Sequence, residues 1–330
     1  MEPSPPTDPH LPVPDLRERP AEAMAAGLTL GESPEGFRSG FVALVGRPNV
    51  GKSTLLNQLV GEKVAITSPI AQTTRNRLRA ILTTPQAQLV LVDTPGIHKP
   101  HHLLGERLVQ SARGAIGEVD VVLLLVDGSQ PAGRGDGFIV DLLARSATPV
   151  HVALNKHDLV DPAAAEALAA SYRDLVPDWR LHPVSALTGD GTAALVQALA
   201  ADLPVGPHLY PADAISDQPE QLLLAELIRE QVLQHTREEV PHSVAVQIDR
   251  IVDDGPRTAV LATVLVERNS QKGILIGKGG RMLRDIGSGA RQQMQKLIDG
   301  PVYLELFVKV VPNWRRNANR LAELGYRGDS

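Results

Sequence analysis

The chain has 330 residues, a formal net charge of −5 and no cysteine. A chain of this length is expected to form about two domains. Its content of 22% charged and 43% hydrophobic residues is that of an ordinary soluble protein. The net charge excludes a uniformly basic nucleic-acid coat, so any RNA-binding surface must be local. The lack of cysteine excludes disulfides and thiol chemistry.

We expect residues 1–38 to form a disordered extension. Seven of the first twenty residues are proline, which disfavours both a helix and a packed core. The segment lacks the basic and apolar blocks of a signal peptide. A misassigned start codon is the alternative, since Met24 lies downstream. The longest apolar run, at 119–127, is shorter than the about 20 residues that span a bilayer, and we expect a cytoplasmic protein.

Residues 39–204 show the pattern of an α/β domain, in which apolar runs alternate with helical segments. Such alternation predicts a mainly parallel sheet with helices on both faces, and its chemistry lies beyond the carboxyl ends of the strands. The expected strands are 41–45, 88–93, 121–127, 149–156 and 181–185, and the expected helices are 52–60, 103–117, 136–146, 161–175 and 191–202.

The stretch GRPNVGKST at 46–54 matches the phosphate-binding loop G-x-x-x-x-G-K-[ST] and lies between a strand and a helix. Its backbone N–H groups and the start of the following helix would bind the phosphates of a nucleotide. Lys52 would bridge the β- and γ-phosphates, and Ser53 would ligate Mg²⁺. The predicted nucleotide-binding residues here are Gly46, Asn49, Val50, Gly51, Lys52, Ser53 and Thr54.

Three further motifs, each after a strand, indicate that the base is guanine. In DTPG at 93–96, Asp93 would hold Mg²⁺ through a water molecule and Gly96 would donate its N–H to the γ-phosphate. In NKHD at 155–158, the Asp158 carboxylate can accept hydrogen bonds from guanine N1–H and N2–H₂, which adenine does not offer.

The remaining contacts to the base come from neighbouring residues of the same two motifs. Asn155 would support the other edge of the base, and the stem of Lys156 would pack on its face. In SAL at 185–187, which comprises Ser185, Ala186 and Leu187, the Ala186 N–H could donate to guanine O6.

Residues 64–80 lie where a sensor of the γ-phosphate belongs, and either Thr73 or Thr74 could bind Mg²⁺ there. Ile97 stands directly after DTPG, where Ras-type GTPases place the glutamine that orients water. We therefore expect slow intrinsic hydrolysis. One alternative is an RNA-binding module whose guanine-nucleotide site is regulatory and hydrolyses negligibly. A P-loop kinase or ATPase is disfavoured because it has no use for NKHD.

A second, α+β domain is expected at 219–330, after a linker at 205–218 rich in proline and aspartate. The order helix (219–239), strand (243–252), strand (258–268), helix (281–299) and strand (301–310) suits a type II KH topology. Between the second strand and the helix lies a G-x-x-G loop, Gly277-Lys278-Gly279-Gly280, which would approach a sugar–phosphate chain closely. Arg281 and Arg284 follow it, and residues 268–320 carry eleven Lys or Arg against three Asp or Glu.

At this point the sequence resembles the Era family, bacterial ribosome-assembly GTPases with a C-terminal KH domain. The resemblance covers about 40–327, and it rests on motifs beyond a generic GTPase. The matching stretches are GRPNVGKSTLLN, SPIAQTTR, DTPGIHKP, NKHD, SAL, YPADAISDQPE, EEVPHSVAV, ERNSQKGILIGKGG and LGY.

The resemblance implies GTP as the small-molecule substrate, Mg²⁺ as cofactor and Thr74 rather than Thr73 as its ligand. Related GTPases that lack the glutamine use an asparagine of the phosphate loop to bind K⁺, so Asn49 joins Lys52 and Thr74 as a candidate catalytic residue. The resemblance also implies an apolar residue after DTPG, so Ile97 agrees with the family pattern.

The resemblance further implies that a monomer binds the single-stranded 3′ end of 16S rRNA on the 30S subunit during its assembly and maturation, with access to that RNA governed by GTP. Some members associate weakly with the inner face of the cell membrane. No basic amphipathic segment of this sequence independently supports that association.

Overall fold

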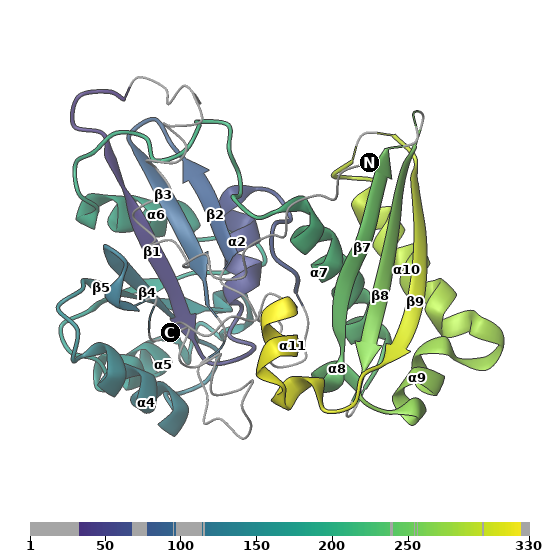
Figure 1. Ribbon diagram of the computed structural model, residues 1–330. Helices are drawn as coiled ribbons and strands as arrows, with labels where there is room; N and C mark the ends of the chain where they lie inside the picture. The colour runs from purple at the N-terminus through teal and green to yellow at the C-terminus, as the bar shows by residue number, and fades with distance from the viewer. Residues whose placement is uncertain are drawn as a thin grey trace.

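The computed structural model describes residues 33–67, 78–94, 96, 114, 116–237, 240–253, 255, 257–298 and 300–324. Within these ranges the chain forms a six-stranded sheet followed by a three-stranded sheet, and each sheet carries its own helices (Figure 1). Most of the helix expected at 103–117 lies outside the described residues.

The first sheet has the strand order β2-β3-β1-β4-β5-β6. Five of its strands run parallel, as expected, and β2 pairs with β3 in the antiparallel direction at one edge. Because β1, β3, β4 and β5 are parallel, their carboxyl ends meet at one edge of the sheet. The strands are β1 (Arg38–Gly46), β2 (Leu78–Thr83), β3 (Ala87–Asp93), β4 (Val121–Asp127), β5 (Val150–Asn155) and β6 (Arg180–Pro183).

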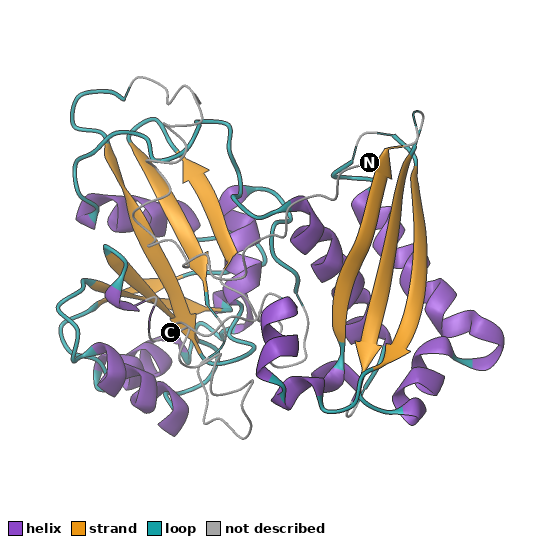
Figure 2. Ribbon diagram, in the orientation of Figure 1, coloured by secondary structure: helices purple, strands orange, loops and turns teal. Residues whose placement is uncertain are grey.

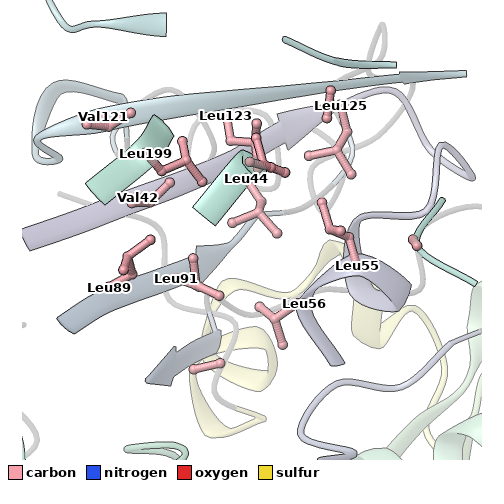
Figure 3. Close-up of a cluster of buried hydrophobic side chains, with 14 of the residues drawn as sticks. Val42, Leu44, Leu55, Leu56, Leu89, Leu91, Val121, Leu123, Leu125 and Leu199 are labelled. Carbon is pink, nitrogen blue, oxygen red and sulfur yellow. The ribbon is translucent and has the colours of Figure 1, made fainter. Parts of the chain in front are cut away.

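Helices cover both faces of this sheet, because each helix buries an apolar side against it. On one face, leucines of α2 (Lys52–Val60) and α6 (Thr192–Asp202) pack on alternate residues of β1, β3 and β4, as Figure 3 shows for Leu44, Leu55 and Leu199. On the other face, α4 (Arg134–Leu143) and α5 (Ala165–Arg173) cover a second core. Each buried leucine contributes about 1.5–3 kcal/mol, so this packing fixes the loops at the strand ends.

The predicted linker and N-terminal extension both need correction. The segment at 205–218 is packed against the first sheet: the Gln88 side chain accepts from the backbone N–H groups of Leu209 and Tyr210 at 2.7 and 2.9 Å. Arg79 pairs with Asp217 at 3.0 Å. The extension predicted at 1–38 is too long at its end, because Phe37 is buried and Arg38 begins β1.

The second sheet is three-stranded, with β7 (Ala245–Asp253) antiparallel and β9 (Val302–Val310) parallel to the central β8 (Thr258–Val266). The long helices α7 (Glu220–His235) and α10 (Arg281–Met294) bury their apolar sides on one of its faces (Figure 2). The order helix, strand, strand, helix, strand is the one predicted for the second domain, and the parallel pairing of β8 with β9 is an addition from the structure.

Several short elements of this second domain were not expected from the sequence. The stretch before the glycine loop forms a helix, α9 (Asn269–Ile276), so this domain contains more helix than the predicted element order includes. The others are α8 (Val240–Ser243), η3 (Trp314–Arg316) and α11 (Ala318–Glu323). Trp314 and Leu321 pack with Ala245 and Leu265 in a separate small core. Among the described residues, no helix is long and apolar enough to cross a membrane.

Candidate functional site

The loop at 46–54 follows β1 directly and passes very close to its neighbours. A Cβ at Gly46 would lie 2.4 Å from the carbonyl oxygen of Leu125, and one at Gly51 would lie 2.3 Å from Asn155 Nδ2. Gly51 has φ +97° and Asn49 has φ 65°, so both adopt the left-handed conformation. The close approaches at Gly46 and Gly51 leave no room for a side chain, so the loop requires glycine at these two positions, as the motif predicts.

Lys52, in the first turn of α2, points back into this loop. Its Nζ donates to the carbonyl oxygens of Gly46 and Arg47 at 3.1 and 3.0 Å. Burial lowers the pKa of Lys52 to about 8, an effect that the nearby Asp93 carboxylate opposes. An anion bound in the loop would stabilise the ammonium form, so the geometry suits a lysine that binds phosphate.

Ser53, in the first turn of α2, and Asp93, at the end of β3, are in contact. The Ser53 Oγ donates to Asp93 Oδ2 at 2.8 Å, and Asp93 is fully buried at the end of β3. A hydroxyl and a carboxylate oxygen are hard ligands of the kind that Mg²⁺ takes, so this pair fits the predicted metal. A Cβ at Gly96 would lie 2.9 Å from the Pro48 backbone nitrogen, which places DTPG against the phosphate loop.

Asn155, at the end of β5, joins NKHD to two other motifs, the phosphate loop and SAL. Its Nδ2 donates to the carbonyl oxygen of Val50 at 2.8 Å, and its Oδ1 accepts from the backbone N–H of Ala186 at 2.9 Å. Asn155 thus holds NKHD to the phosphate loop and to SAL, rather than standing alone at the edge of a base. If the Ala186 N–H donates to guanine O6 as predicted, it must divide its hydrogen bond between that oxygen and Asn155 Oδ1.

Lys156 and Asp158 of NKHD lie in a short turn that continues into η1 (His157–Leu159). The Ser185 Oγ donates to Asp158 Oδ1 at 2.6 Å, while the Asp158 side chain as a whole is exposed. This arrangement fixes the carboxylate and leaves it accessible to the donors of a base. Leu187 is 75% exposed beside it.

Lys156 has φ 65° and its Nζ donates to Asp127 Oδ2 at 2.6 Å. Although burial alone would raise the pKa of Asp127, hydrogen bonds from Lys156 and Ser129 lower it overall. The sequence reasoning missed Asp127, although it ends a buried strand in the same way as Asp93 and Asn155. Its position at the carboxyl end of β4 was a usable signal.

A second missed feature is the ion pair between Arg47 of the phosphate loop and Asp136 of α4. The Arg47 Nε donates to Asp136 Oδ1 at 2.7 Å, and Asp136 is 1% exposed. The other carboxylate oxygen accepts from the Gly133 N–H at 3.0 Å, so the same side chain caps α4. A buried, doubly bonded carboxylate fixes the position of the arginine, and with it the first part of the loop.

For four of the residues discussed in the sequence analysis, the contacts described above give no position in the site. Thr73, Thr74 and Ile97 lie outside the described residues. Thr54 lies in the first turn of α2 and is partly exposed.

The predicted RNA loop has the backbone that its glycines suggest. Gly277, Gly279 and Gly280 have φ of 68°, 61° and 75°, and the loop includes η2 (Lys278–Gly280) before α10 begins. A Cβ at Gly279 would meet no atom within 4 Å, so the loop is open there, whereas one at Gly277 would lie 2.7 Å from Met282 Cβ. The loop therefore presents its backbone to solvent.

Basic side chains surround this loop. Lys278, Arg281 and Arg284 are exposed, and the Arg284 Nη2 donates to the carbonyl oxygen of Gly279 at 3.1 Å. Arg281 is 84% exposed and 3.9 Å from Asp285, too loose a pair to neutralise it. The cluster combines an accessible glycine backbone with long, exposed cationic side chains. This combination suits binding of the phosphate backbone of a nucleic acid.

The fold and these sites define the class of protein as a P-loop GTPase domain followed by a KH domain. Comparison with known families agrees: the model described as "50S ribosome-binding GTPase" matches residues 41–156, and the model "KH domain" matches residues 239–315. Similar relatives include GTPase Era of Synechocystis sp., 58% identical over 91% of this chain and 96% of that protein. GTPase Era of Nostoc sp. is 57% identical over 92% of this chain and 94% of that protein. The chain belongs to the Era GTPase family.

Two solved structures are similar along most of the chain. Era in complex with MgGDPNP and nucleotides 1506–1542 of 16S ribosomal RNA has a TM-score of 0.85 and 40% identity, covering 88% of this chain and 99% of that one. A variant of Aquifex aeolicus Era bound to GDP and AlF₄⁻ also has a TM-score of 0.85, with 39% identity over 88% of this chain and 99% of that one. Both alignments extend over the two domains.

Proposed function

We propose that this chain is a GTP-hydrolysing switch whose KH domain binds the 3′ end of 16S rRNA and promotes assembly and maturation of the 30S subunit. The observation that carries the proposal is the double hydrogen bond of Asn155, to Val50 and to Ala186. It gathers the phosphate loop and the two base-reading motifs into one site. Such a site serves a nucleotide with both a phosphate tail and a defined purine.

The base would be guanine, and Asp158 would read it. Ser185 holds one oxygen of the Asp158 carboxylate, which leaves the side chain positioned to accept from guanine N1–H and N2–H₂. Adenine would leave this carboxylate without donors, at a cost of about 1–3 kcal/mol or more. Lys156 would cover the face of the base from its fixed place on Asp127.

For hydrolysis, Ser53, Asp93 and Thr74 would hold Mg²⁺, which when bound neutralises charge that develops on the phosphates. Lys52 would donate to the β- and γ-phosphates, exchanging its present carbonyl acceptors for them. Asn49, fixed in the left-handed conformation, would hold K⁺ near the phosphates. Without a glutamine after DTPG, water would be oriented poorly and intrinsic turnover would be slow.

The RNA would lie along the glycine loop, with its backbone close to Gly277, Gly279 and Gly280. Lys278, Arg281 and Arg284 would contact its phosphates, since they are exposed and lie in the loop or in the first turn of α10. The solved Era complex contains nucleotides 1506–1542 of 16S rRNA, and we extend that ligand to this chain. The functional units we propose are the GTPase domain at 39–204 and the KH domain at 219–330, connected by the packed segment 205–218. The protein would act as a cytoplasmic monomer that associates weakly, at most, with the inner membrane face.

Two measurements test this function. In the first, unlabelled GTP, GDP and ATP compete with labelled GDP for the purified chain, and we expect GTP and GDP but not ATP to displace it. In the second, the chain is crosslinked to RNA in cells and the RNA is sequenced, with reads expected at the 3′ end of 16S rRNA. Displacement by ATP as effective as by GTP would contradict the guanine assignment, and reads spread evenly over cellular RNA would contradict the RNA assignment.

A further inference from the structure

The sheet of the second domain buries one of its two faces against helices. On β9, Leu304, Leu306 and Val308 pack into the core that α7 and α10 share with the sheet. Successive side chains of a strand point to opposite faces, so the residues between these leucines and valine lie on the other side. We call this side the outer face of the sheet. On β9 it carries Tyr303, Glu305, Phe307 and Lys309.

Two aromatic side chains of the outer face are exposed. Tyr303 is 48% exposed and Phe307 is 53% exposed, although only 3% of the chain is aromatic. The two are four positions apart on β9, or about 13 Å along the strand. Their neighbours on β8 are Ala259 and Thr263, whose small side chains leave the rings accessible. The guanidinium carbon of Arg257 lies 5.7 Å from the centre of the Tyr303 ring. Exposed rings in such an arrangement indicate a contact surface.

The charges of the outer face favour an anionic partner. Arg250, Arg257 and Lys309 are exposed there, against the carboxylates of Asp249 and Glu305. Three positive charges against two negative ones leave an excess of one, on a chain whose formal net charge is −5. A partner that offers both flat rings and negative charges fits this surface. Single-stranded nucleic acid offers both, as bases and phosphates.

The outer face is also continuous with the predicted RNA loop. The edge strand β9 packs against α9 and α10, the two helices that flank the glycine loop. A loop of this kind clamps about four nucleotides, so a longer strand must leave it, and β9 is the neighbouring edge. At one end of the outer face, Trp314 and Leu321 of η3 and α11 cover Leu265. Beyond that end, the rings of Phe307 and Tyr303 follow each other along β9.

We propose that the outer face is a second RNA-contact surface, on which unpaired bases stack against Phe307 and Tyr303 while Arg250, Arg257 and Lys309 contact the phosphates. Aromatic side chains on an exposed sheet stack bases in other RNA-binding modules, and such stacking accepts any base. The surface extends the site at the glycine loop, so it adds affinity for RNA long enough to reach both. The inference rests on the proposed function, since it requires that the second domain bind RNA.

Two RNA probes of different length separate the outer face from the glycine loop. The long probe is nucleotides 1506–1542 of 16S rRNA, and the short probe is a single strand of about four nucleotides from its 3′ end, the length that the loop clamps. Both are titrated into the full chain at one fixed salt concentration, because phosphate contacts depend on salt. Tyr303→Ala and Phe307→Ala should each weaken binding of the long probe about fivefold or more, and leave binding of the short probe within about twofold of wild type.

Conservative variants distinguish stacking from a structural role. Tyr303→Phe and Phe307→Tyr keep the ring and should bind the long probe as wild type does. Phe307→Trp should also bind it, and its exposed indole should lose fluorescence when a base stacks on it. Glu305→Gln removes a carboxylate that repels phosphates from between the two rings, so binding of the long probe should tighten about twofold.

Phe138→Ala is the matched control, because Phe138 is 47% exposed on α4 of the first domain. It should keep wild-type affinity for both probes. Wild-type affinity for the long probe in the double variant Tyr303→Ala and Phe307→Ala would overturn the inference alone. Weaker binding of that variant to 30S particles, with its RNA affinity unchanged, would assign the outer face to a protein partner and would also overturn it. A wild type that binds neither probe would overturn the proposed function together with the inference.

Discussion

The side-chain amide of Asn155 donates to the backbone carbonyl oxygen of Val50 at 2.8 Å, joining the end of β5 to the phosphate loop after β1. The two residues are separated by 105 positions in the sequence. Gly51, next to Val50, leaves room for the amide only because it lacks a Cβ. This hydrogen bond therefore connects the phosphate-binding part of the site to the base-reading part. A substitution that removes it should weaken binding of the whole nucleotide.

Asn155→Ala should weaken GDP binding by about 10- to 100-fold. The substitution leaves the buried Val50 carbonyl and the Ala186 N–H without their partner, and each such loss costs about 1–3 kcal/mol. Fluorescence titration with labelled GDP measures the effect, after circular dichroism has shown that the variant folds. Asn269→Ala, on an exposed residue of α9, is the control. A GDP affinity within twofold of wild type would contradict the role of Asn155.

Asp158→Asn should change the base that is preferred. The variant loses charge-assisted hydrogen bonds worth about 1.5–3 kcal/mol each, so GTP affinity should fall at least tenfold. Ser185 can still donate to the amide oxygen, which directs the amide N–H₂ toward the base, where it can donate to the extra carbonyl of xanthine. Competition between GDP and xanthosine diphosphate measures the change.

Asp161→Asn is the matched control for this experiment, since Asp161 is exposed, three residues further along the chain, and accepts only a local bond from Ala163. It should retain the preference for guanine. Undiminished GDP affinity in Asp158→Asn would remove Asp158 from the site.

Gly279→Asp should abolish RNA binding and leave GDP binding unchanged. The carboxylate would stand where the phosphate chain approaches, and it would repel that chain. Gly255→Asp is a close control, because Gly255 has a similar φ of 65° and also has no atom within 4 Å of a built Cβ. Both variants should bear a similar backbone strain. Equal loss of RNA affinity in the two would show that strain, and not the site, explains the result.

Stability should depend on pH through His182. Burial, together with the nearby His151 and Arg180, lowers the pKa of His182, and His151 in turn contacts Asp202 at 2.8 Å. Because the unfolded chain then binds a proton more readily than the folded one, the free energy of unfolding should fall as the pH drops below about 6.5.

Urea unfolding at pH 7.5 and pH 5.5 measures this effect in wild type and in His182→Gln. The variant should lose less stability between the two pH values, by less than the about 1.4 kcal/mol per pH unit that one proton allows. His235→Gln, on an exposed residue, should behave as wild type. An identical pH dependence in His182→Gln and wild type would contradict the assignment.

Local sequence patterns predicted most of the fold, since strands such as 121–127 are continuous apolar runs and α2 follows a specific motif. They failed where long-range contacts decide the structure. The segment 205–218 has no periodicity of its own and is held by Gln88 and Arg79 of the sheet. The helix α9 is only eight residues long and contains Gly273, so its sequence does not predict a helix, and its packing on β8 and β9 stabilises it instead.

The site divides in the same way. Residues within motifs, such as Lys52, Asp93 and Asp158, could be predicted because their spacing is fixed by a strand followed by a loop. Partners from other elements, such as Asp136 on a helix with no motif, could not be predicted. Their roles depend on where the chain returns in space, which no local pattern encodes.

The most direct test of the account is multiple-turnover phosphate release from GTP, measured with 30S particles present, in potassium and in sodium buffer. We predict slow release by the chain alone, faster release with the particles, and more in potassium than in sodium. Lys52→Ala should remove the activity. No release under any of these conditions would contradict the central claim that this chain is a GTP-hydrolysing switch, and would leave an RNA-binding module with a regulatory nucleotide site.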